Sequence, residues 1–507
     1  MKLYWGDIHN HNEVGVGKGS MERSYAIARG SLDFYAFTPH GWWPDISDSD
    51  PKIRDYHLAG FARVKDAWDR VVEEANAGCV DGSFVSLIAY EWHSSGWGDY
   101  CVYFPGDRGE LYYAEDIKDL GRFVSRQGAL MMPHHCAYRQ GWRGTNWSWF
   151  DSSLSPTAEI FSEHGNSLEP DSHFGMVRHS MGGSSRSQTV LAQLRRGAVV
   201  GFTAGTDDHF GFPGCHGEGL TGLYADGLTR QTVIDAIRRR HTYGVSGDRI
   251  ELALSTPEGM MGDVLTADAE RMFRIDVVAK AEIDTVQLLK NGHPAAVWPG
   301  LPADGSLPAG EQAVARIEWG WDGMMSGDVT EWDIEVEIEG GEIASAEPCF
   351  SGGPQVVDRL NTLAREGRGS CAIRSFTCRS NFEPTHAVVL TLRVGADAKI
   401  RIRARGRWGE RGFERELGAS AAELKGSDVS VDVAPVFSAP KIKIHQLLPE
   451  AAVRMSMDYE DRAAGGSRSA GSAADAHGGP AAADWYLAKV LQRNGHMAWS
   501  SPIWFGP

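Results

Sequence analysis

The chain has 507 residues, is 42% hydrophobic and 23% charged, and carries a formal net charge of −17 at pH 7. That length exceeds what one hydrophobic core usually supports, so we expect two or three domains. The negative charge repels a phosphate backbone and no basic stripe offsets it, so we expect no nucleic-acid partner. The absence of a run of about 18 apolar residues argues against a membrane span.

The first residues, MKLYWGDIHNHN, lack the basic start and apolar stretch of a secretory signal. We therefore expect a cytoplasmic protein. The seven cysteines include no CxxC pair, which argues against a disulfide framework and a structural zinc knuckle.

Short apolar runs alternate with amphipathic segments over the first 250 residues. The runs predict buried strands at Leu3–Ile8, Asp33–Thr38, Phe84–Tyr90, Ala129–Met132, Ala158–Phe161 and Val199–Thr203. Helices are expected between them, the first with Ser20 as N-cap and Gly30 at its C-terminal end, and the others at Arg54–Ala75, Glu115–Arg126, Gln188–Arg196 and Thr229–Arg240. Repeated β-then-α units favour a parallel sheet or a TIM-like barrel over residues 1–248, with its chemistry at the C-terminal ends of the strands.

From Arg249 onward the pattern changes to β-like segments separated by turns rich in Gly, Pro and Asp. This predicts a β-sandwich domain over residues 249–507. Residues 463–483 are rich in Gly, Ser and Ala and are expected to form a flexible loop. Strands at Trp485–Leu491 and Ala498–Phe505 would then return as a hairpin that completes the sandwich.

Potential metal ligands follow each of the six predicted strands. They are His9 and His11, His40, Glu91, His134 and His135, His164, and Asp207, Asp208 and His209. Residues i and i+2 share a side of an extended chain, so the His-Asn-His run can present two imidazoles to one cation. Mixed imidazole and carboxylate ligands suit zinc, manganese or iron, and a carboxylate such as Glu91 can bridge two cations. A cation pair would lower the pKa of a bound water toward neutrality.

The runs Gly6–His11, Leu32–His40 and Gly205–His209 resemble the PHP (polymerase and histidinol phosphatase) superfamily. The pieces Tyr90-Glu91-Trp92, Pro133–His135 and Ser162–Gly165 are similar to its branch of carbaryl-hydrolase-like metallohydrolases. The likeness covers roughly residues 3–250, and the β-rich remainder resembles the C-terminal module of that branch.

This resemblance implies a distorted seven-stranded (β/α) barrel holding two or three divalent cations. It implies one metal on His9, His11, Glu91 and Asp207, a second on Glu91, His134 and His164, and His40 and His209 at a third position. The family's Ser-Asp-Gly-like turn is absent after His11. Glu13 or Glu22 could substitute for its acid; otherwise the third metal is absent and His40 or His209 serves as general acid or base.

Weaker candidates surround this set. Arg139 and Arg143 could clamp an anionic substrate, although ordinary surface arginines are the simpler interpretation. His135 and Trp42 could also touch substrate, whereas His93 lies beside a stronger candidate, Glu91.

The sequence therefore predicts a metal-dependent hydrolase acting on a phosphoester, carboxylic ester or carbamate of a small molecule, with Glu91, His40 and His209 as catalytic residues. The alternative is a glycan-binding protein that uses the Trp-rich loops and the sandwich, with a non-catalytic barrel. The sequence leaves the oligomeric state open, a homo-oligomer included.

Overall fold

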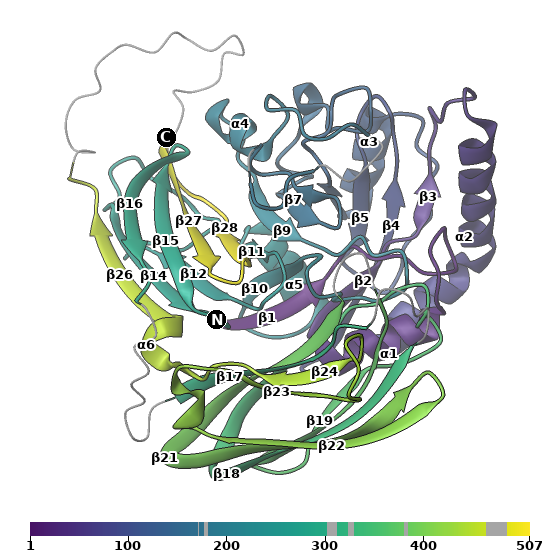
Figure 1. Ribbon diagram of the computed structural model, residues 1–507. Coiled ribbons are helices and arrows are strands. Elements are labelled where there is room, and N and C mark those ends of the chain that lie inside the picture. The colour runs from purple at the N-terminus through teal and green to yellow at the C-terminus, as the bar shows by residue number, and fades with distance from the viewer. Residues whose placement is uncertain are drawn as a thin grey trace.

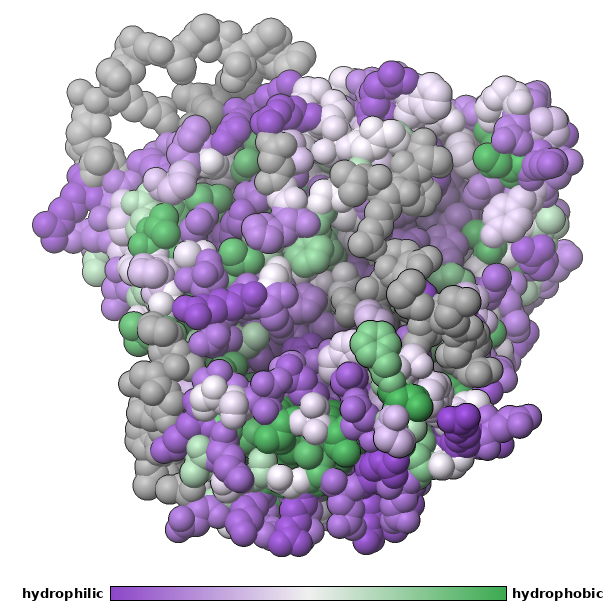
Figure 2. Space-filling view, viewed as in Figure 1, coloured by the Kyte–Doolittle hydropathy of each residue, from purple (hydrophilic) through white to green (hydrophobic). Residues whose placement is uncertain are grey.

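The computed structural model describes residues 1–170, 172–176, 181–301, 312–322, 329–379, 384–462 and 484–506 (Figure 1). The segment predicted to be a flexible loop, residues 463–483, lies outside the described residues. Figure 2 shows a largely hydrophilic face with small hydrophobic patches. Among the described residues, no helix combines the length and apolar character needed to cross a membrane.

Strands of the N-terminal half form a mixed sheet. All six predicted strands are present in the structure. The mixed sheet also includes strands from the C-terminal end of the chain. In hydrogen-bonded order its main path is β13 (Val264–Leu265), β29 (Ile503–Phe505), β27 (Asp484–Gln492), β28 (Met497–Ser500), β11 (Thr242–Val245), β10 (Leu220–Ala225), β1 (Lys2–Asp7), β2 (Phe34–Phe37), β4 (Val85–Trp92), β5 (Tyr100–Phe104) and β6 (Leu130–Pro133). The strands β3 (His40–Trp42), β15 (Ile283–Lys290) and β16 (His293–Pro299) pair beside this path. A separate small sheet has the order β8 (Gly165–Asn166), β7 (Thr157–Ser162) and β9 (Gly201–Ala204).

The first five α-helices lie where the sequence predicted them, and the short sixth helix was not predicted. The helices are α1 (Met21–Ser31), α2 (Pro51–Gly78), α3 (Ile117–Gln127), α4 (Val190–Arg195), α5 (Arg230–Arg238) and α6 (Glu450–Val453). The hydroxyl of Ser20 caps α1 by accepting from the Arg23 amide, as predicted. The predicted end at Gly30 is wrong, because α1 continues to Ser31 and is followed by an extended Leu32.

The predicted TIM-like (β/α) barrel is wrong. The described residues hold twenty-nine strands, β1–β29, but only six α-helices, α1–α6, and these strands do not close into a barrel. Three neighbouring pairs, β1–β10, β4–β5 and β5–β6, are antiparallel. An antiparallel neighbour needs no crossover helix. β4, β5 and β6 are buried along their whole length, which gives them the continuous apolar pattern of parallel strands.

Two further sheets make up much of the C-terminal half, where the sequence predicted β structure. A nine-stranded sheet has the order β19 (Thr362–Arg365), β20 (Ser370–Thr377), β18 (Thr330–Cys349), β21 (Thr385–Trp408), β17 (Gln312–Gly320), β24 (Lys441–Ile444) and β23 (Val429–Asp432), with β22 (Arg411–Ser420) and β25 (Leu448–Pro449) beside it. A three-stranded sheet has the order β12 (Glu251–Ser255), β14 (Met272–Val278) and β26 (Arg454–Glu460). In Figure 1 the nine-stranded sheet curls beneath the rest of the molecule.

The last strands of the chain return to the first sheet. β27 pairs with β15, and β28 pairs with both β27 and β11. Hydrogen bonding therefore crosses the domain boundary predicted at residue 248. The division into residues 1–248 and 249–507 stays a prediction.

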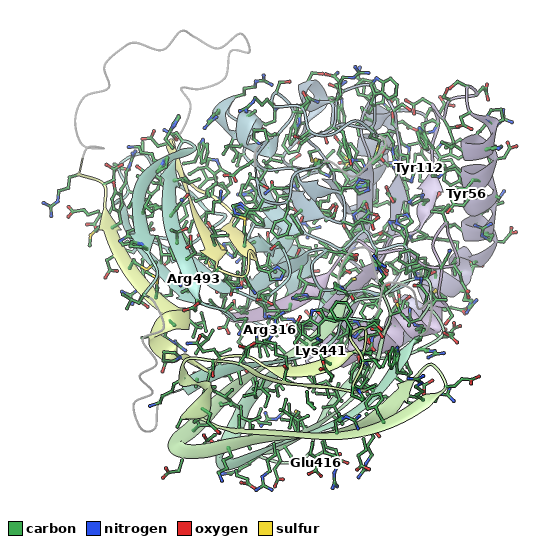
Figure 3. All side chains as sticks on the ribbon, in the orientation of Figure 1. Tyr56, Tyr112, Arg316, Glu416, Lys441 and Arg493 are labelled. Carbon is green, nitrogen blue, oxygen red and sulfur yellow. The ribbon has the colours of Figure 1, made fainter. Side chains whose placement is uncertain are left out.

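Asp248 joins three separate parts of the chain. Its buried carboxylate accepts from Arg316 Nη1 at 3.1 Å on the nine-stranded sheet, and from His216 Nε2 at 3.0 Å. It also accepts from Gln492 Nε2 at 2.8 Å and from Asn494 Nδ2 at 2.7 Å. Figure 3 places Arg316 where the nine-stranded sheet meets the rest of the molecule. Four donors to one buried carboxylate fix the C-terminal sheets against the N-terminal half.

Arg23 makes a second connection. From α1 its guanidinium donates to the Gly211 carbonyl at 3.0 Å, in the loop that follows β9. It also donates to the carbonyls of Val356 at 3.0 Å and Arg359 at 2.7 Å, in the chain that follows β18. Arg23 thereby links a loop of the N-terminal half to the β-rich half.

We expect Asp248→Asn to lower the free energy of unfolding by about 3–5 kcal/mol, because it leaves the largely buried Arg316 charge without its partner. Denaturant unfolding of both proteins measures this. Asp284→Asn, a change at an exposed aspartate, is the matched control and should shift stability by less than about 0.5 kcal/mol. Equal stabilities of wild type and Asp248→Asn would contradict the assigned role.

The contact between His216 and Asp248 predicts that the stability of the protein depends on pH. Burial alone would lower the pKa of His216, but Cys349 and the Asp248 carboxylate raise it from 6.5 to about 10. Because the pKa of His216 is higher in the folded state than in the unfolded state, protonated His216 stabilises the fold fully below pH 6.5. This contribution is lost as the pH rises toward 10. The stability advantage of wild type over His216→Gln should therefore shrink between pH 7 and pH 10. A constant difference in denaturant midpoint across that range would show that His216 does not titrate there.

Candidate metal centre

Six strand ends converge on one buried cluster. His9 and His11 follow β1, His40 begins β3, and Glu91 lies near the end of β4. The remaining members follow the ends of β6, β7 and β9, and they are His134, His164, Asp207 and His209. β1, β2 and β4 are parallel, and β6 runs parallel to β4 through two antiparallel pairings. Their C-terminal ends therefore meet at one edge although no barrel forms.

Glu91 lies at the centre of the cluster. Its Oε2 is 3.1 Å from Nε2 of His40, and its Oε1 is 2.9 Å from Nε2 of His134. The same Oε2 is 3.5 Å from His11 Nε2 and 3.8 Å from His9 Nε2. The two carboxylate oxygens thus face different histidines, as a bridging ligand requires.

Asp207 provides a second shared carboxylate. Its Oδ1 lies 2.8 Å from His11 Nε2 and 3.3 Å from His9 Nε2, while its Oδ2 lies 3.0 Å from His164 Nε2. The backbone of Asp207 has φ +55°, in the left-handed region. Strained backbone of this kind is concentrated at functional sites. Asp207 therefore connects the His9–His11 pair to His164.

Electrostatics hold the two shared carboxylates and His40 in the protonation states that bind metals, whereas the pKa of His9, which burial would lower, is raised well above 6.5 by the Asp207 carboxylate. Burial alone would raise the pKa of Glu91, yet the imidazoles of His93 and His40 hold it well below its usual range. Burial would likewise raise the pKa of Asp207, and His9 is the largest of the influences that hold it low. Burial lowers the pKa of His40 well below 6.5. Anionic carboxylates and a neutral imidazole are the forms that bind metals.

Several buried atoms of the cluster have no hydrogen-bond partner among the described residues. They include His9 Nε2, Glu91 Oε2 and both ring nitrogens of His134. His134 Nε2 is close to Glu91 but not in hydrogen-bond geometry. Unpaired buried polar atoms are costly, and a shared cation would satisfy them. The donor set of imidazoles and carboxylates fits zinc, manganese or iron.

Outer partners fix the orientation of two imidazoles. Nδ1 of His9 lies 2.8 Å from the buried Glu159 carboxylate, which leaves Nε2 facing the cluster. Nδ1 of His164 lies 3.0 Å from the Tyr138 hydroxyl. Such partners commonly set the tautomer and the basicity of metal-binding histidines.

All eight predicted metal ligands thus lie in one cluster, whereas the substitutes for the family's third-site acid do not. Glu13 and Glu22 are both exposed, and Glu22 pairs with Arg70. His11, His40 and His209 still place three ring nitrogens within 4.8 Å of one another. A third metal would therefore rest on imidazoles.

The predicted substrate residues are placed differently from one another. Arg143 donates to the buried Asp99 through Nε at 2.6 Å and lies over the Trp43 ring. Arg139 is exposed and lies over Trp142, at 4.8 Å from the ring centroid. Arg143 therefore lies inside the site, paired with a carboxylate, and Arg139 on the surface.

His135 and Trp42 flank the cluster. His135 is buried, with Nε2 at 3.2 Å from Asp99 Oδ2. Trp42 packs against Tyr113 and Phe61, with ring centroids at 5.4 Å and 6.2 Å.

Sequence reasoning did not find Asp99, His57 and Cys101, and set His93 aside. His93 Nδ1 is 3.3 Å from Glu91 Oε1 and 3.1 Å from Asp99 Oδ2. His57 reaches the site from α2 and stacks on His40 at 5.5 Å. Cys101 Sγ lies within 4.8 Å of ring nitrogens of His9 and His134. The signal for His93 was available, because it is two residues after Glu91 in extended chain and so shares its side.

A cavity of about 190 Å³ opens beside the cluster. Its walls come from the end of β7, from β8 and the chain after it, from the chain before β10 and from the chain after β18. They are Phe161, Ser162, Glu163, His164, Gly165, His173, Phe174, Gly175, His216, Gly217, Glu218, Ser351 and Gly352. Among these described lining residues there is no lysine or arginine. His164 is shared by the cavity and the cluster.

Parts of the chain are similar to a known family and to known proteins. Residues 166–272 match a family described as a protein of unknown function (DUF3604). That segment includes Asp207 and His209. An uncharacterized protein of Chlamydia muridarum is 22% identical over 320 residues, which are 57% of this chain and 48% of that protein. An uncharacterized protein of Chlamydia trachomatis serovar D is 22% identical over 312 residues, with the same coverage of 57% and 48%. The chain therefore spans about half the length of these curated relatives.

We expect Glu159→Gln to weaken metal binding by about 10- to 100-fold, because a neutral amide makes His9 a less basic ligand. Competition against a chromogenic chelator measures the affinity. The matched control is Glu115→Gln, at an exposed glutamate. Unchanged affinity in Glu159→Gln would contradict the orienting role.

Proposed function

We propose that this protein is a metal-dependent hydrolase of ester-type bonds in small molecules, distantly related to the PHP superfamily. One observation carries the proposal. Histidines from separate strand ends surround two buried carboxylates, and several of their polar atoms have no hydrogen-bond partner among the described residues. The resemblance of the His9–His11, Leu32–His40 and Gly205–His209 runs to the superfamily supports it.

The cluster divides into two overlapping sets of ligands. His9, His11, Glu91 and Asp207 would hold one divalent cation. Glu91, His134 and His164 would hold a second, with Asp207 Oδ2 also beside His164. Bound cations would polarise the scissile group and lower the pKa of a water toward neutrality. Two cations account for most of the cluster, and a third would rest on His11, His40 and His209.

His209 is the best-placed group for proton transfer. Its side chain is 31% exposed, against 0% for His9 and 6% for His40. Its Nδ1 lies 2.8 Å from the Asp207 carbonyl, an acceptor, so Nδ1 carries the proton and Nε2 is left for the site. Burial alone would lower the pKa of His209, but Glu163 and Asp207 raise it to about 9. Nε2 therefore also carries a proton at neutral pH and can donate it to a leaving group at the cluster's accessible side. Glu163, at 3.4 Å from Nδ1, holds the ring in place.

The adjoining cavity favours a carboxylic ester or carbamate over a phosphoester. Its described lining has two glutamates and no lysine or arginine, and the imidazole of His216 is already bonded to Asp248, which disfavours a substrate phosphate. The chain's charge of −17 likewise disfavours a nucleic-acid substrate. We propose a small-molecule substrate and a cytoplasmic location.

The glycan-binding alternative has less support. Trp92, Trp499 and Trp504 are buried, and exposed Trp142 is covered on one side by Arg139. Metal-free protein that binds a sugar tightly would favour that alternative.

We expect Glu91→Gln to release at least one metal equivalent and to reduce hydrolysis by at least about 100-fold, because it removes the shared anionic charge. Elemental analysis of protein purified without chelator measures the metal. A chromogenic panel of carboxylic esters, carbamates and phosphate mono- and diesters measures activity. Glu13→Gln, at an exposed glutamate, is the control. Unchanged metal content and activity in Glu91→Gln would refute the assignment.

A further inference from the structure

The cavity beside the cluster carries two carboxylates of its own. Glu163 directly precedes His164, and Glu218 reaches the cavity from the chain before β10. Glu163 has a partner, because its Oε1 lies 3.4 Å from Nδ1 of His209. Oε2 of Glu218 is buried and has no hydrogen-bond partner among the described residues. One carboxylate oxygen of the cavity wall is therefore left without a donor.

The surroundings of Glu218 disfavour its ionised form unless a cation binds beside it. Burial raises the pKa of its carboxyl well above the usual range, and the neighbouring carboxylates Asp208 and Glu163 raise it further. His216 also lines the cavity, but its Nε2 is bonded to Asp248, so its imidazole is already engaged.

Aromatic rings form another part of the wall. Phe161 and Phe174 pack edge to face with centroids 5.3 Å apart, and Phe174 also stacks on His496 at 6.4 Å. Ring faces attract organic cations through their quadrupole, and the attraction grows when the cation leaves water. A divalent metal ion, in contrast, prefers nitrogen, oxygen and sulfur ligands over phenyl rings. Carboxylates and phenyl rings around one small cavity favour an organic ammonium ion.

The two halves of the molecule build this wall together. Gly352, from the chain after β18, lies against Phe212, where an added Cβ would be 2.6 Å from the Phe212 side chain. Gly165 has φ +100°, and an added Cβ there would be 2.8 Å from the Phe174 carbonyl. Larger residues at these two positions would displace the walls. Glycine at these two positions therefore allows the walls to approach this closely.

We propose that this cavity binds an ammonium group of the substrate, so that the enzyme acts on an ester-type bond in an amine-bearing small molecule. The inference rests on the proposed function, because it assigns the cavity to the same site. The Glu218 carboxylate accepts a hydrogen bond from the ammonium group, and Phe161 and Phe174 cover the alkyl part of the substrate. His164 belongs to both the cavity and the cluster, so the scissile bond reaches the cluster on the His164 side.

Calorimetric titration of the metal-loaded protein tests this with butylammonium, 1-butanol and butyrate. These probes share a chain length and differ in charge. We expect wild type to bind butylammonium at least about tenfold more tightly than 1-butanol, the effect of a charge-assisted hydrogen bond, and to bind butyrate least. Glu218→Gln should lose this preference while keeping the metal content of wild type. The control Glu115→Gln should keep both.

A second variant covers the case in which Glu218→Gln does not fold. Phe174→Leu keeps an apolar wall but removes a ring face, so it should weaken butylammonium binding by about 2- to 30-fold and change 1-butanol binding less. Equal affinity of wild type for butylammonium and 1-butanol would overturn the inference. Loss of a metal equivalent in Glu218→Gln would also overturn it, because the carboxylates would then serve a metal.

The two proposals fail in different ways. Selective ammonium binding without hydrolysis of any ester, carbamate or phosphate would refute the hydrolase but support the ammonium site. Hydrolysis of neutral esters without any preference for butylammonium would support the hydrolase and refute the ammonium site.

Discussion

The structure depends on keeping two carboxylates, Glu91 and Asp207, ionised inside the protein. Burying a lone carboxylate costs several kcal/mol even after relaxation, about the net stability of a domain. The cost is offset only because histidines from different strand ends surround both groups. Cations bound there would complete the compensation. The arrangement of the N-terminal strands can be understood as the means of bringing these side chains to one edge.

A second set of buried charges must also be compensated inside the protein. Asp99 accepts from Arg143 and lies beside His93 and His135, so a carboxylate and a guanidinium compensate each other next to Glu91. Its effect is to anchor the loops after β4 and β6 to one another. Arg143, which the sequence suggested as a clamp for an anionic substrate, is paired with Asp99 instead. That pairing agrees with a site that selects against anions.

The β-rich half takes part in the site as well as in the fold. Asp248 and Arg23 fasten it to loops that follow β9, and Ser351 and Gly352 form part of the cavity wall. A substrate entering the cavity would touch both halves of the chain. Changes at the contact between the halves should therefore alter substrate selection as well as stability.

The sequence by itself determined where the eight predicted ligands lie, at the ends of buried strands. Strand ends and ligand types could be inferred locally, because a buried strand needs a continuous apolar run and its end is where a polar side chain can follow. All eight predicted ligands lie together for that reason. The sequence could not decide how the strands pair, because a strand covered on both faces has the same apolar pattern in parallel and antiparallel neighbours.

Only the tertiary structure therefore showed that β5 and β10 run antiparallel to their neighbours in place of a barrel, and that β27 and β28 return to the first sheet. It also brought Asp99, His57 and Glu218 to the site. Their positions depend on contacts between distant segments, which no local pattern records.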